Sequence, residues 1–198
     1  NPLVNSGAIA IVDLLLPLGL EEMLSAARSL CADDAITLDE AVFQSEWSHS
    51  ARNRSLAYLL QSKGVITEDV EEVLKLYTQL CSLSVNADDL AILGLLLANG
   101  GVHPVTGRRF LQEEVVRTVV TIMLTCGMYD GSGEFAVRVG LPSKSGVGGG
   151  ILSVVPGEMG IGVYGPSLDE KGNSIAGQRI LEYISRTEKL HIMDRFTR

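Results

Sequence analysis

The sequence predicts an α+β fold, in which a multi-helical region precedes a small antiparallel sheet and a last helix. Two observations support this class. Apolar residues recur at helical spacing through roughly the first 130 residues. After Gly127, glycines become dense and β-branched residues gather in two runs, which is typical of strands.

The composition is that of a folded globular protein. The 198 residues are 46% hydrophobic and 20% charged, which allows a sizeable core. The net charge of −8 and the absence of a Lys/Arg cluster argue against nucleic acid and anionic membranes as partners. The longest apolar runs, such as residues 91–98, are too short to cross a bilayer.

Cysteine and histidine usage argues against disulfides and metal sites. The three cysteines are far apart and each lies in an apolar helical pattern: Cys31, Cys81 and Cys126. Their odd number and placement predict buried thiols in a reducing compartment. No spacing of His, Cys or carboxylates resembles a metal site, so we expect no bound metal.

The first half of the chain predicts a series of helices. An apolar helix from about residue 8 should end before Pro17, and a second follows with an apolar stripe. Thr37 and Glu40 could form the capping box of a short helix. A helix over residues 51–63 should then end at Gly64. We expect it to bury Leu56, Leu59 and Leu60.

Three more helices are predicted before the glycine-rich region. Thr67 can cap a helix through about residue 81, which carries the clearest amphipathic pattern in the chain. Residues 90–98 predict a more buried helix that stops at Asn99, and residues 112–126 predict another.

The last third predicts a β-hairpin and a helix. Residues 144–156 and 160–165 read as strands joined by a tight turn at Pro156-Gly157. Asn173 can cap a final helix through about residue 185. Its buried face is predicted to hold Ala176, Ile180 and Ile184. No linker stands out, so we expect one domain over 1–198, with a helical part (1–130) and a strand-and-helix part (131–198).

Lys144-Ser145-Gly146, at the start of a predicted strand, carries the strongest chemical signal. It resembles the Lys-Thr/Ser-Gly motif of penicillin-binding proteins and serine β-lactamases. A strand that presents a cation, a hydroxyl and exposed backbone N–H groups can hold an acyl substrate and stabilise an oxyanion. Taken alone, three common residues could also start a strand by chance.

Neighbouring segments extend the resemblance over nearly the whole chain. In this order they are NPLVNSGAIA, FQSEWSHSARN, LYTQLCS, ANGGVHPVTG, CGMYDGSGEFAVRVGLPSKSGVGGGI and LDEKGNS. Together they resemble the glutaminase family, from Asn1 to about Ser185. The resemblance implies the β-lactamase-like serine hydrolase fold, here incomplete. It also implies hydrolysis of L-glutamine to L-glutamate and ammonia through a serine acyl-enzyme.

The same resemblance implies the protein's partners and location. No metal or organic cofactor is required for this chemistry, and L-glutamine and L-glutamate are the expected ligands. Family members are usually homo-oligomers, so a dimer or tetramer is expected. The expected location is the cytoplasm, or the mitochondrion if the source is a eukaryote.

By resemblance, Asn5, Glu46 and Asn53 bind the substrate. Glu46 and Asn53 match the residues that hold the α-ammonium and α-carboxylate groups. On one continuous helix they would lie about 10 Å apart along the axis, too far for one head group. We therefore predict a chain break at residues 47–50, with Glu46 on a loop and Asn53 at a helix start. From the residues alone, Asn5 could instead be an N-cap, and the other two a solvated helix face.

By resemblance, Tyr77, Tyr129 and Val147 serve catalysis. Tyr77 matches a proton-relaying tyrosine, although it also fits the apolar stripe of its helix. Tyr129 matches a second active-site tyrosine, in a glycine-rich turn. Val147 matches a residue whose backbone N–H helps to form the oxyanion hole, where one donor contributes about 3–4 kcal/mol. We expect both tyrosines to contact the substrate as well.

The chain departs from the family at the nucleophile. No serine in it is followed by Lys three residues later, whereas the family uses Ser-x-x-Lys. In the family this motif lies upstream of NPLVNSGA, where the chain begins, so we expect the nucleophile to be cut off, not ordered or naturally absent. Two alternatives therefore stay open: a non-catalytic glutamine- or glutamate-binding or assembly module, and a penicillin-interacting serine hydrolase.

Overall fold

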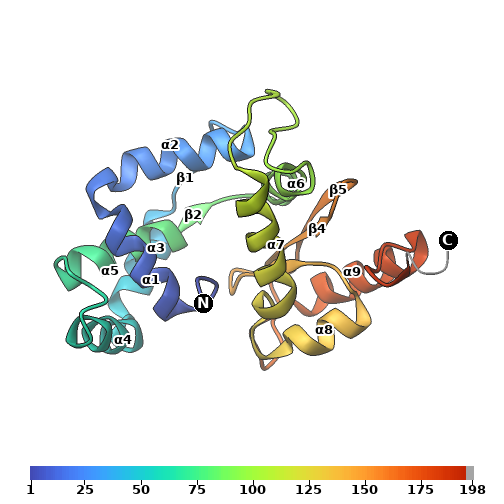
Figure 1. Ribbon diagram of the computed structural model, residues 1–198. Helices are drawn as coiled ribbons and strands as arrows, with labels where there is room; N and C mark the ends of the chain where they lie inside the picture. The colour runs from blue at the N-terminus through green and yellow to red at the C-terminus, as the bar shows by residue number, and fades with distance from the viewer. Residues whose placement is uncertain (195–198) are drawn as a thin grey trace. The chain divides into compact units, whose positions relative to one another are not determined.

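The computed structural model describes residues 1–194 and has the predicted α+β class, with helices and small antiparallel sheets (Figure 1). Its contacts divide the chain into two compact units. Unit 1 comprises residues 1–29 and 33–85, and unit 2 comprises residues 30–32 and the chain from Asn86 onward. This boundary differs from residue 130, where the texture of the sequence changes, because α6 packs on the later strands.

Helices dominate the first 85 residues. The elements are α1 (Asn5–Leu15), a 3₁₀ turn (Leu16–Leu18), α2 (Gly19–Cys31), β1 (Thr37–Leu38), α3 (Glu40–Ser48), α4 (Ala51–Ser62), α5 (Val70–Cys81) and β2 (Leu83–Ser84). β1 and β2 pair antiparallel, with Thr37 opposite Ser84. The predicted Thr37–Glu40 capping box is therefore wrong. Thr37 is in a strand, and Asp39 caps α3 by accepting from the Val42 N–H at 3.0 Å.

The core of unit 1 forms where α1, α4 and α5 meet. Its buried residues are Ile9, Val12, Ala57, Ile66, Val70, Val73, Leu74, Leu76 and Tyr77. The amphipathic pattern of α5 is thus confirmed, since most of these residues belong to it. On α4 the prediction is wrong in detail: Ala57 is fully buried, whereas Leu59 is 56% exposed.

Asp13 on α1 ties the loop before α5 to the core of unit 1. This carboxylate, 4% exposed, accepts from the Thr67 N–H and hydroxyl at 3.2 Å and from the Glu68 N–H at 3.1 Å. Thr67 is thus a donor to Asp13 and not the predicted cap. Asp69 caps α5, accepting from the Glu71 and Glu72 N–H groups at 2.9 and 3.0 Å.

Replacing Asp13 should destabilise unit 1. Asp13→Ala removes the acceptor of two backbone N–H groups and one hydroxyl, so we expect a loss of about 2–3 kcal/mol in the free energy of unfolding. Urea denaturation followed by circular dichroism measures it. Asp34→Ala, at an exposed carboxylate, is the control and should stay within about 0.5 kcal/mol of wild type. Equal stabilities of the two variants would contradict the role given to Asp13.

Unit 2 combines helices with a three-stranded antiparallel sheet. The elements are α6 (Ala87–Ala98), α7 (Glu113–Cys126), a 3₁₀ turn η2 (Tyr129–Gly131), α8 (Ser132–Arg138), β3 (Ser143–Ser145), β4 (Gly150–Val155), β5 (Met159–Tyr164) and α9 (Ile175–Glu188). The strand order is β3-β4-β5.

The hairpin predicted at Pro156-Gly157 is confirmed, because Val155 of β4 pairs with Met159 of β5 around that turn. The run predicted as one strand over residues 144–156 is instead two strands. Its glycines form a second turn, closed by a 2.9 Å bond from the Gly149 N–H to the Gly146 carbonyl. Gly149 has φ +98, which favours glycine, so the chain reverses there.

Glycines on β5 let helix α6 lie directly on the sheet. A Cβ atom added to Gly160 would come within 2.1 Å of the Leu95 nitrogen, and one on Gly162 within 1.9 Å of the Ala87 oxygen. Only glycine fits such an approach of backbone to backbone. A hydrophobic core cluster of unit 2 contains residues of β4, β5, α8 and α9 and of the loops beside them. Its buried residues are Met128, Phe135, Val139, Leu141, Ile151, Val155, Val163 and Leu181.

The last helix is rotated relative to the prediction. Ser174, not Asn173, caps α9 by accepting from the Gly177 N–H at 3.1 Å. The buried residues of α9 are Gly177, Leu181 and Ser185. The predicted face is wrong, since Ala176 and Ile180 are exposed and Ile184 is only partly buried. One residue along a helix corresponds to 100°, so a pattern read one position early selects a different face.

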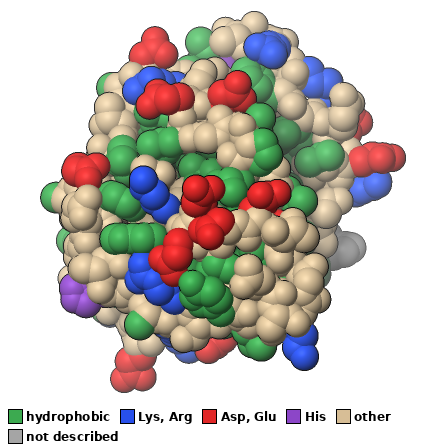
Figure 2. Space-filling view, turned by 90° about the vertical axis from the view of Figure 1, so that its left-hand side faces the viewer, with side chains coloured by type: hydrophobic (Ala, Val, Ile, Leu, Met, Phe, Trp, Pro, Cys, Tyr) green, Lys and Arg blue, Asp and Glu red, His purple; other side chains and the backbone are tan. Residues whose placement is uncertain are grey.

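The structure of residues 1–194 also tests the predictions about membrane spans and cysteines. No helix among them combines the length and the apolar character that a membrane span requires. Within residues 1–194 none of the three cysteines is in a disulfide, but only Cys31 is buried. Cys126 is half-buried and Cys81 is exposed, so the prediction that all three are buried is wrong. On the face seen in Figure 2, acidic and basic side chains are interspersed with apolar ones.

Candidate functional site

The six predicted site residues fall into two groups, one on each unit. Unit 1 carries Asn5, Glu46, Asn53 and Tyr77, and unit 2 carries Tyr129 and Val147.

Asn5 and Asn53 are brought together. Asn5 is the first residue of α1, and its Nδ2 donates to the Oδ1 of Asn53 at 2.9 Å. Asn53 lies in the first turn of α4, as predicted, and Val4 is the N-cap of α1. Asn5 therefore does not serve as the cap of its helix. Two side-chain amides 48 residues apart thus meet at an exposed position, where they can bind a polar ligand.

Glu46 lies beside a break between two helices. The break is present as predicted, because α3 ends at Ser48 and α4 begins at Ala51. The predicted loop position is wrong: Glu46 is in the last turn of α3. Its side chain is exposed and makes no ion pair within residues 1–194. A carboxylate near a helix C-terminus opposes the helix dipole, so Glu46 contributes nothing favourable to its own helix.

Arg54 contacts residues on both sides of the corner between α3 and α4. Its guanidinium lies 4.4 Å from the centre of the Trp47 ring and 3.1 Å from a Glu71 carboxylate oxygen. It also donates to the Ser50 hydroxyl, which in turn donates to the Trp47 carbonyl at 2.6 Å. No local signal in the sequence identifies Arg54, because its ionic partner is 17 residues away.

Tyr77 belongs to the core of unit 1. It is 9% exposed and packs in the cluster of α1, α4 and α5 residues. Its position on the apolar stripe of α5 is therefore confirmed, whereas its catalytic role stays a prediction. A tyrosine can combine both functions, with its ring in the core and its hydroxyl at a polar edge.

Tyr129 and Val147 flank the same glycine in unit 2. A Cβ atom built on Gly172 would lie 3.7 Å from a ring carbon of Tyr129 and 3.7 Å from Cγ1 of Val147. The Lys144 ammonium lies 4.9 Å from the centre of the Tyr129 ring. The side chain of Val147 is 67% exposed, in the turn between β3 and β4. This cluster therefore brings a phenol, a cation and a glycine-rich turn together.

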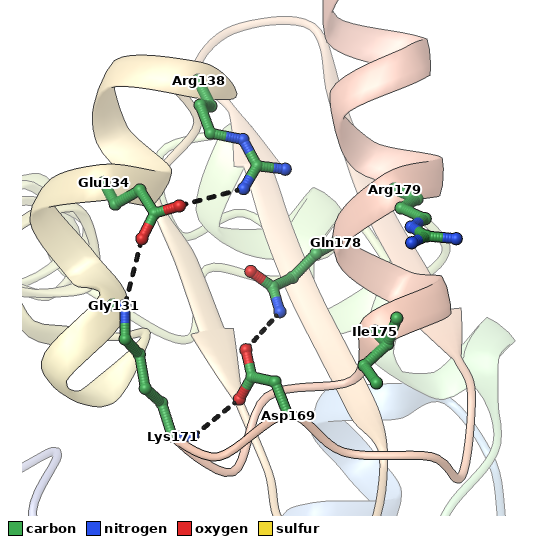
Figure 3. A pocket seen from close by; sticks show the side chains of 8 residues that line it. All are labelled: Gly131, Glu134, Arg138, Asp169, Lys171, Ile175, Gln178 and Arg179. Carbon is green, nitrogen blue, oxygen red and sulfur yellow. Dashed lines mark hydrogen bonds and ion pairs between the residues drawn. The ribbon is translucent and has the colours of Figure 1, made fainter.

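Two cavities lie elsewhere, each within one unit. The cavity in unit 2, of about 270 Å³, is shown in Figure 3 and is lined by Gly131, Glu134, Arg138, Asp169, Lys171, Ile175, Gln178 and Arg179. A groove of about 480 Å³ in unit 1 is lined by Glu40, Phe43, Gln44, Trp47, Lys75 and Gln79. None of the six predicted site residues lines either one.

Three of the charged side chains around the cavity of unit 2 are paired with one another. Glu134 lies between Lys171, at 3.0 Å, and Arg138, at 3.2 Å (Figure 3). Hydrogen bonds from these two cations lower the pKa of the Glu134 carboxyl. Burial by itself would raise the pKa of Asp169, but hydrogen bonds from the Asn173 backbone and the Gln178 side chain outweigh it and lower the pKa.

Asp169 should therefore contribute to the loss of folding stability at low pH. Its folded-state pKa lies below the ordinary value of 3.8, so its stabilisation is present above that value and is lost as the pH falls further. We expect Asp169→Asn to cost about 1–2 kcal/mol at pH 7 and to approach wild type below pH 3. Thermal melts over this pH range measure the difference. Glu170→Gln, at the exposed neighbouring residue, is the control and should stay within about 0.5 kcal/mol of wild type at pH 7.

Comparison with known proteins identifies the family. The sequence model described as "Glutaminase" matches residues 1–193. The chain belongs to the glutaminase family. Glutaminases of Clostridium tetani and Clostridioides difficile are both 52% identical to it over 196 residues, which is 97% of this chain. The chain spans 64% and 63% of the lengths of these two relatives.

Solved glutaminase structures share the fold. A Bacillus subtilis glutaminase, in covalent complex with 5-oxo-L-norleucine formed by reaction with 6-diazo-5-oxo-L-norleucine, is 39% identical with a TM-score of 0.92. That match covers 97% of this chain and 69% of the other. Mglu in its glutamate form is 40% identical with a TM-score of 0.92, covering 98% and 45%. Glutaminases adopt the β-lactamase-like fold, so that expectation is confirmed.

Within residues 1–194, no group of three or more His, Cys, Asp or Glu side chains is arranged to hold a metal ion. The predicted site residues offer amide groups, a carboxylate and a phenol on unit 1, and a phenol and a backbone N–H on unit 2. These groups can bind a small polar ligand and stabilise or move charge.

Proposed function

We propose that the complete protein containing this chain hydrolyses L-glutamine to L-glutamate and ammonia through a serine acyl-enzyme. Membership in the glutaminase family supports the reaction. The observation that carries it is the meeting of Asn5 and Asn53 beside the α3–α4 corner that presents Glu46. A carboxylate and two amides are the complementary groups for the ammonium and carboxylate of a free amino acid.

We propose that the six residues divide among them the binding of the substrate, the transfer of protons and the stabilisation of the oxyanion. Glu46 would accept hydrogen bonds from the α-ammonium group, while Asn53 and Asn5 would donate to the carboxylate and fix the substrate. Tyr77 and Tyr129 would contact the substrate and move protons between nucleophile and leaving ammonia. The Val147 N–H would donate to the oxyanion that develops on the amide oxygen when the nucleophile attacks the amide carbon. No metal or organic cofactor takes part in these steps.

The nucleophile is proposed to be a serine in a Ser-x-x-Lys motif. The Bacillus subtilis relative forms a covalent complex with 5-oxo-L-norleucine, whose C5 carbonyl corresponds to the amide carbon of glutamine. None of the serines in this chain has Lys three positions later. Labelling of the complete protein with 6-diazo-5-oxo-L-norleucine, followed by peptide mass spectrometry, should therefore modify a serine outside these residues. A label on one of their own serines would refute this assignment.

Ammonia release tests the reaction. The complete protein should release ammonia from L-glutamine and little from L-asparagine, because the shorter side chain holds its amide away from the oxyanion donors. No turnover, together with calorimetric binding of L-glutamate that Glu46→Ala abolishes, would favour the non-catalytic binder. A covalent penicillin adduct without glutamine turnover would favour the penicillin-interacting hydrolase.

We propose one glutaminase domain that includes both units, since the family match extends across both of them. We also propose L-glutamate as a ligand, because Mglu, a 40% identical protein, has been solved in its glutamate form. A homo-oligomer, dimer or tetramer, is proposed and is testable by light scattering. Free thiols throughout residues 1–194 and bacterial relatives favour the cytoplasm.

A further inference from the structure

The backbone of Tyr129 has an unusual conformation. Its φ is +51, in the left-handed region that bulky side chains seldom adopt. The residue starts the 3₁₀ turn η2, directly after the buried Met128. Such a conformation persists only where the surroundings hold it, and it often marks a functional position.

Ser132 holds the turn from one side. Its hydroxyl accepts from the Met128 N–H at 3.0 Å and donates to the Tyr129 carbonyl at 2.8 Å. One oxygen atom is thus bonded to the backbone on both sides of the Met128–Tyr129 peptide bond. Ser132 is 6% exposed, so water does not readily replace it.

Asn173 holds the turn from the other side. Its Nδ2 donates to the Met128 carbonyl at 3.1 Å, across 45 residues of sequence, and it is 1% exposed. The preceding residue, Gly172, has φ +91 and lies against the Tyr129 ring. The loop over residues 169–174 therefore contacts both the backbone and the side chain of the tyrosine turn.

The loop over residues 169–174 is itself fixed. The Asp169 carboxylate accepts from the backbone N–H groups of Lys171 and Asn173, both at 2.9 Å. The Lys171 ammonium pairs with Glu134 on α8 (Figure 3). Asn173 is therefore anchored independently of Tyr129, as a group that positions another residue must be.

We propose that Ser132 and Asn173 are positioning residues that hold Tyr129 in the conformation its chemistry needs. The proposal rests on the catalytic role proposed for Tyr129. Neither side chain acts on substrate; each restrains the peptide groups flanking the tyrosine. Release of the turn would let φ return to negative values and would displace the phenol. A displacement of about 1 Å of a reacting group can reduce the rate about 100-fold.

The first test compares two buried serines in the complete protein. Ser132→Ala removes both bonds of the turn. The control, Ser185→Ala on α9, removes a bond from a buried hydroxyl to the Val139 carbonyl at the end of α8. Both variants should lower the melting temperature. Only Ser132→Ala should lower kcat for L-glutamine, about 100-fold, with KM changed less than threefold. Ser132→Thr, which retains the hydroxyl, should recover most of the loss.

A double-mutant comparison separates positioning from a general structural effect. Tyr129→Phe removes the phenolic hydroxyl, so adding Ser132→Ala to it should reduce kcat no further. Asn173→Ala provides a second, independent variant with the same expectation. The proposal is overturned if kcat is unchanged in Ser132→Ala. It is also overturned if the effects of the two substitutions multiply.

Hydrogen exchange tests the restraint without any activity. Amides of residues 128–132 should exchange at least tenfold faster in Ser132→Ala than in wild type and remain unchanged in Ser185→Ala. Absence of glutamine turnover in wild type would refute the proposed function, and the exchange result would still decide the restraint. Unchanged exchange in Ser132→Ala would refute the restraint even in an active enzyme.

Discussion

Gly162→Ala is expected to prevent unit 2 from reaching its native packing. The added methyl group would lie 1.9 Å from the Ala87 carbonyl oxygen and 2.8 Å from the Ala91 nitrogen. Both are backbone atoms of α6, so no side chain can rotate away to make room. Overpacking usually costs about 1–3 kcal/mol, and a clash between main chains should exceed that range.

A second glycine provides the matched control. For Gly133, in α8, no heavy atom beyond its chain neighbours and its own helix backbone lies within 4 Å of an added Cβ. In a helix alanine is favoured over glycine by about 1 kcal/mol. Gly133→Ala should therefore equal or exceed wild type in melting temperature. Gly162→Ala should be insoluble or melt at least 10 °C lower. A Gly162→Ala protein that melts within 2 °C of wild type would show that α6 does not rest on the β5 backbone.

The close packing of α6 explains which parts of the fold the sequence could predict. Strong patterns, such as the apolar stripe of α5 and the turn after Val155, gave the correct elements because they depend on neighbouring residues. Glycines within a strand, as in β5, indicate a close approach of another backbone. Their partner, helix α6, could not be identified, because it lies more than 60 residues earlier in the chain.

The errors at helix ends have a common physical cause. Thr67, Thr37 and Asn173 each match the residue preferences of a cap, yet each makes a different interaction. Thr67 donates to Asp13, Thr37 joins a strand, and Asn173 donates to Met128. Polar side chains near a helix start have several local and distant partners available, and sequence preference alone cannot choose among them.

The candidate site was predictable only where the resemblance supplied it. Asn5 and Asn53 carry no signal of their own, yet they form a hydrogen bond 48 residues apart. Glu46 was placed on a loop, although α3 continues for two residues beyond it. Asn173 gives no local sign of its bond to the tyrosine turn, because the Met128 carbonyl that it binds lies 45 residues away in the sequence.

Glu46→Gln is expected to reduce glutamine hydrolysis strongly without harming the fold. In the proposed complex the carboxylate accepts from the substrate ammonium. Truncating one partner of such a hydrogen-bonded charge pair costs about 2–5 kcal/mol. Since about 1.4 kcal/mol corresponds to tenfold, kcat/KM should fall by a factor of about 30 to 4,000, chiefly through a higher KM. The measurement is steady-state ammonia release by the complete protein.

The position of Glu46 makes the stability outcome unusual for a site substitution. Its charge lies in the last turn of α3, where it opposes the helix dipole, and no ion pair within residues 1–194 offsets this. Neutralising it should therefore leave stability unchanged or raise it by about 0.3–1 kcal/mol. Glu72→Gln is the matched control, because Glu72 lies in the first turn of α5, where a negative charge is favourable.

The two substitutions should therefore change stability in opposite directions. Glu72→Gln is expected to lose a few tenths of a kcal/mol in stability, by about the same helix-dipole effect, and to keep full activity. Glu46→Gln should keep or gain stability and lose activity. Wild-type kcat/KM in Glu46→Gln would remove the carboxylate from substrate recognition. A loss of both stability and activity would instead indicate that Glu46 supports the fold, contrary to its exposure at the end of α3.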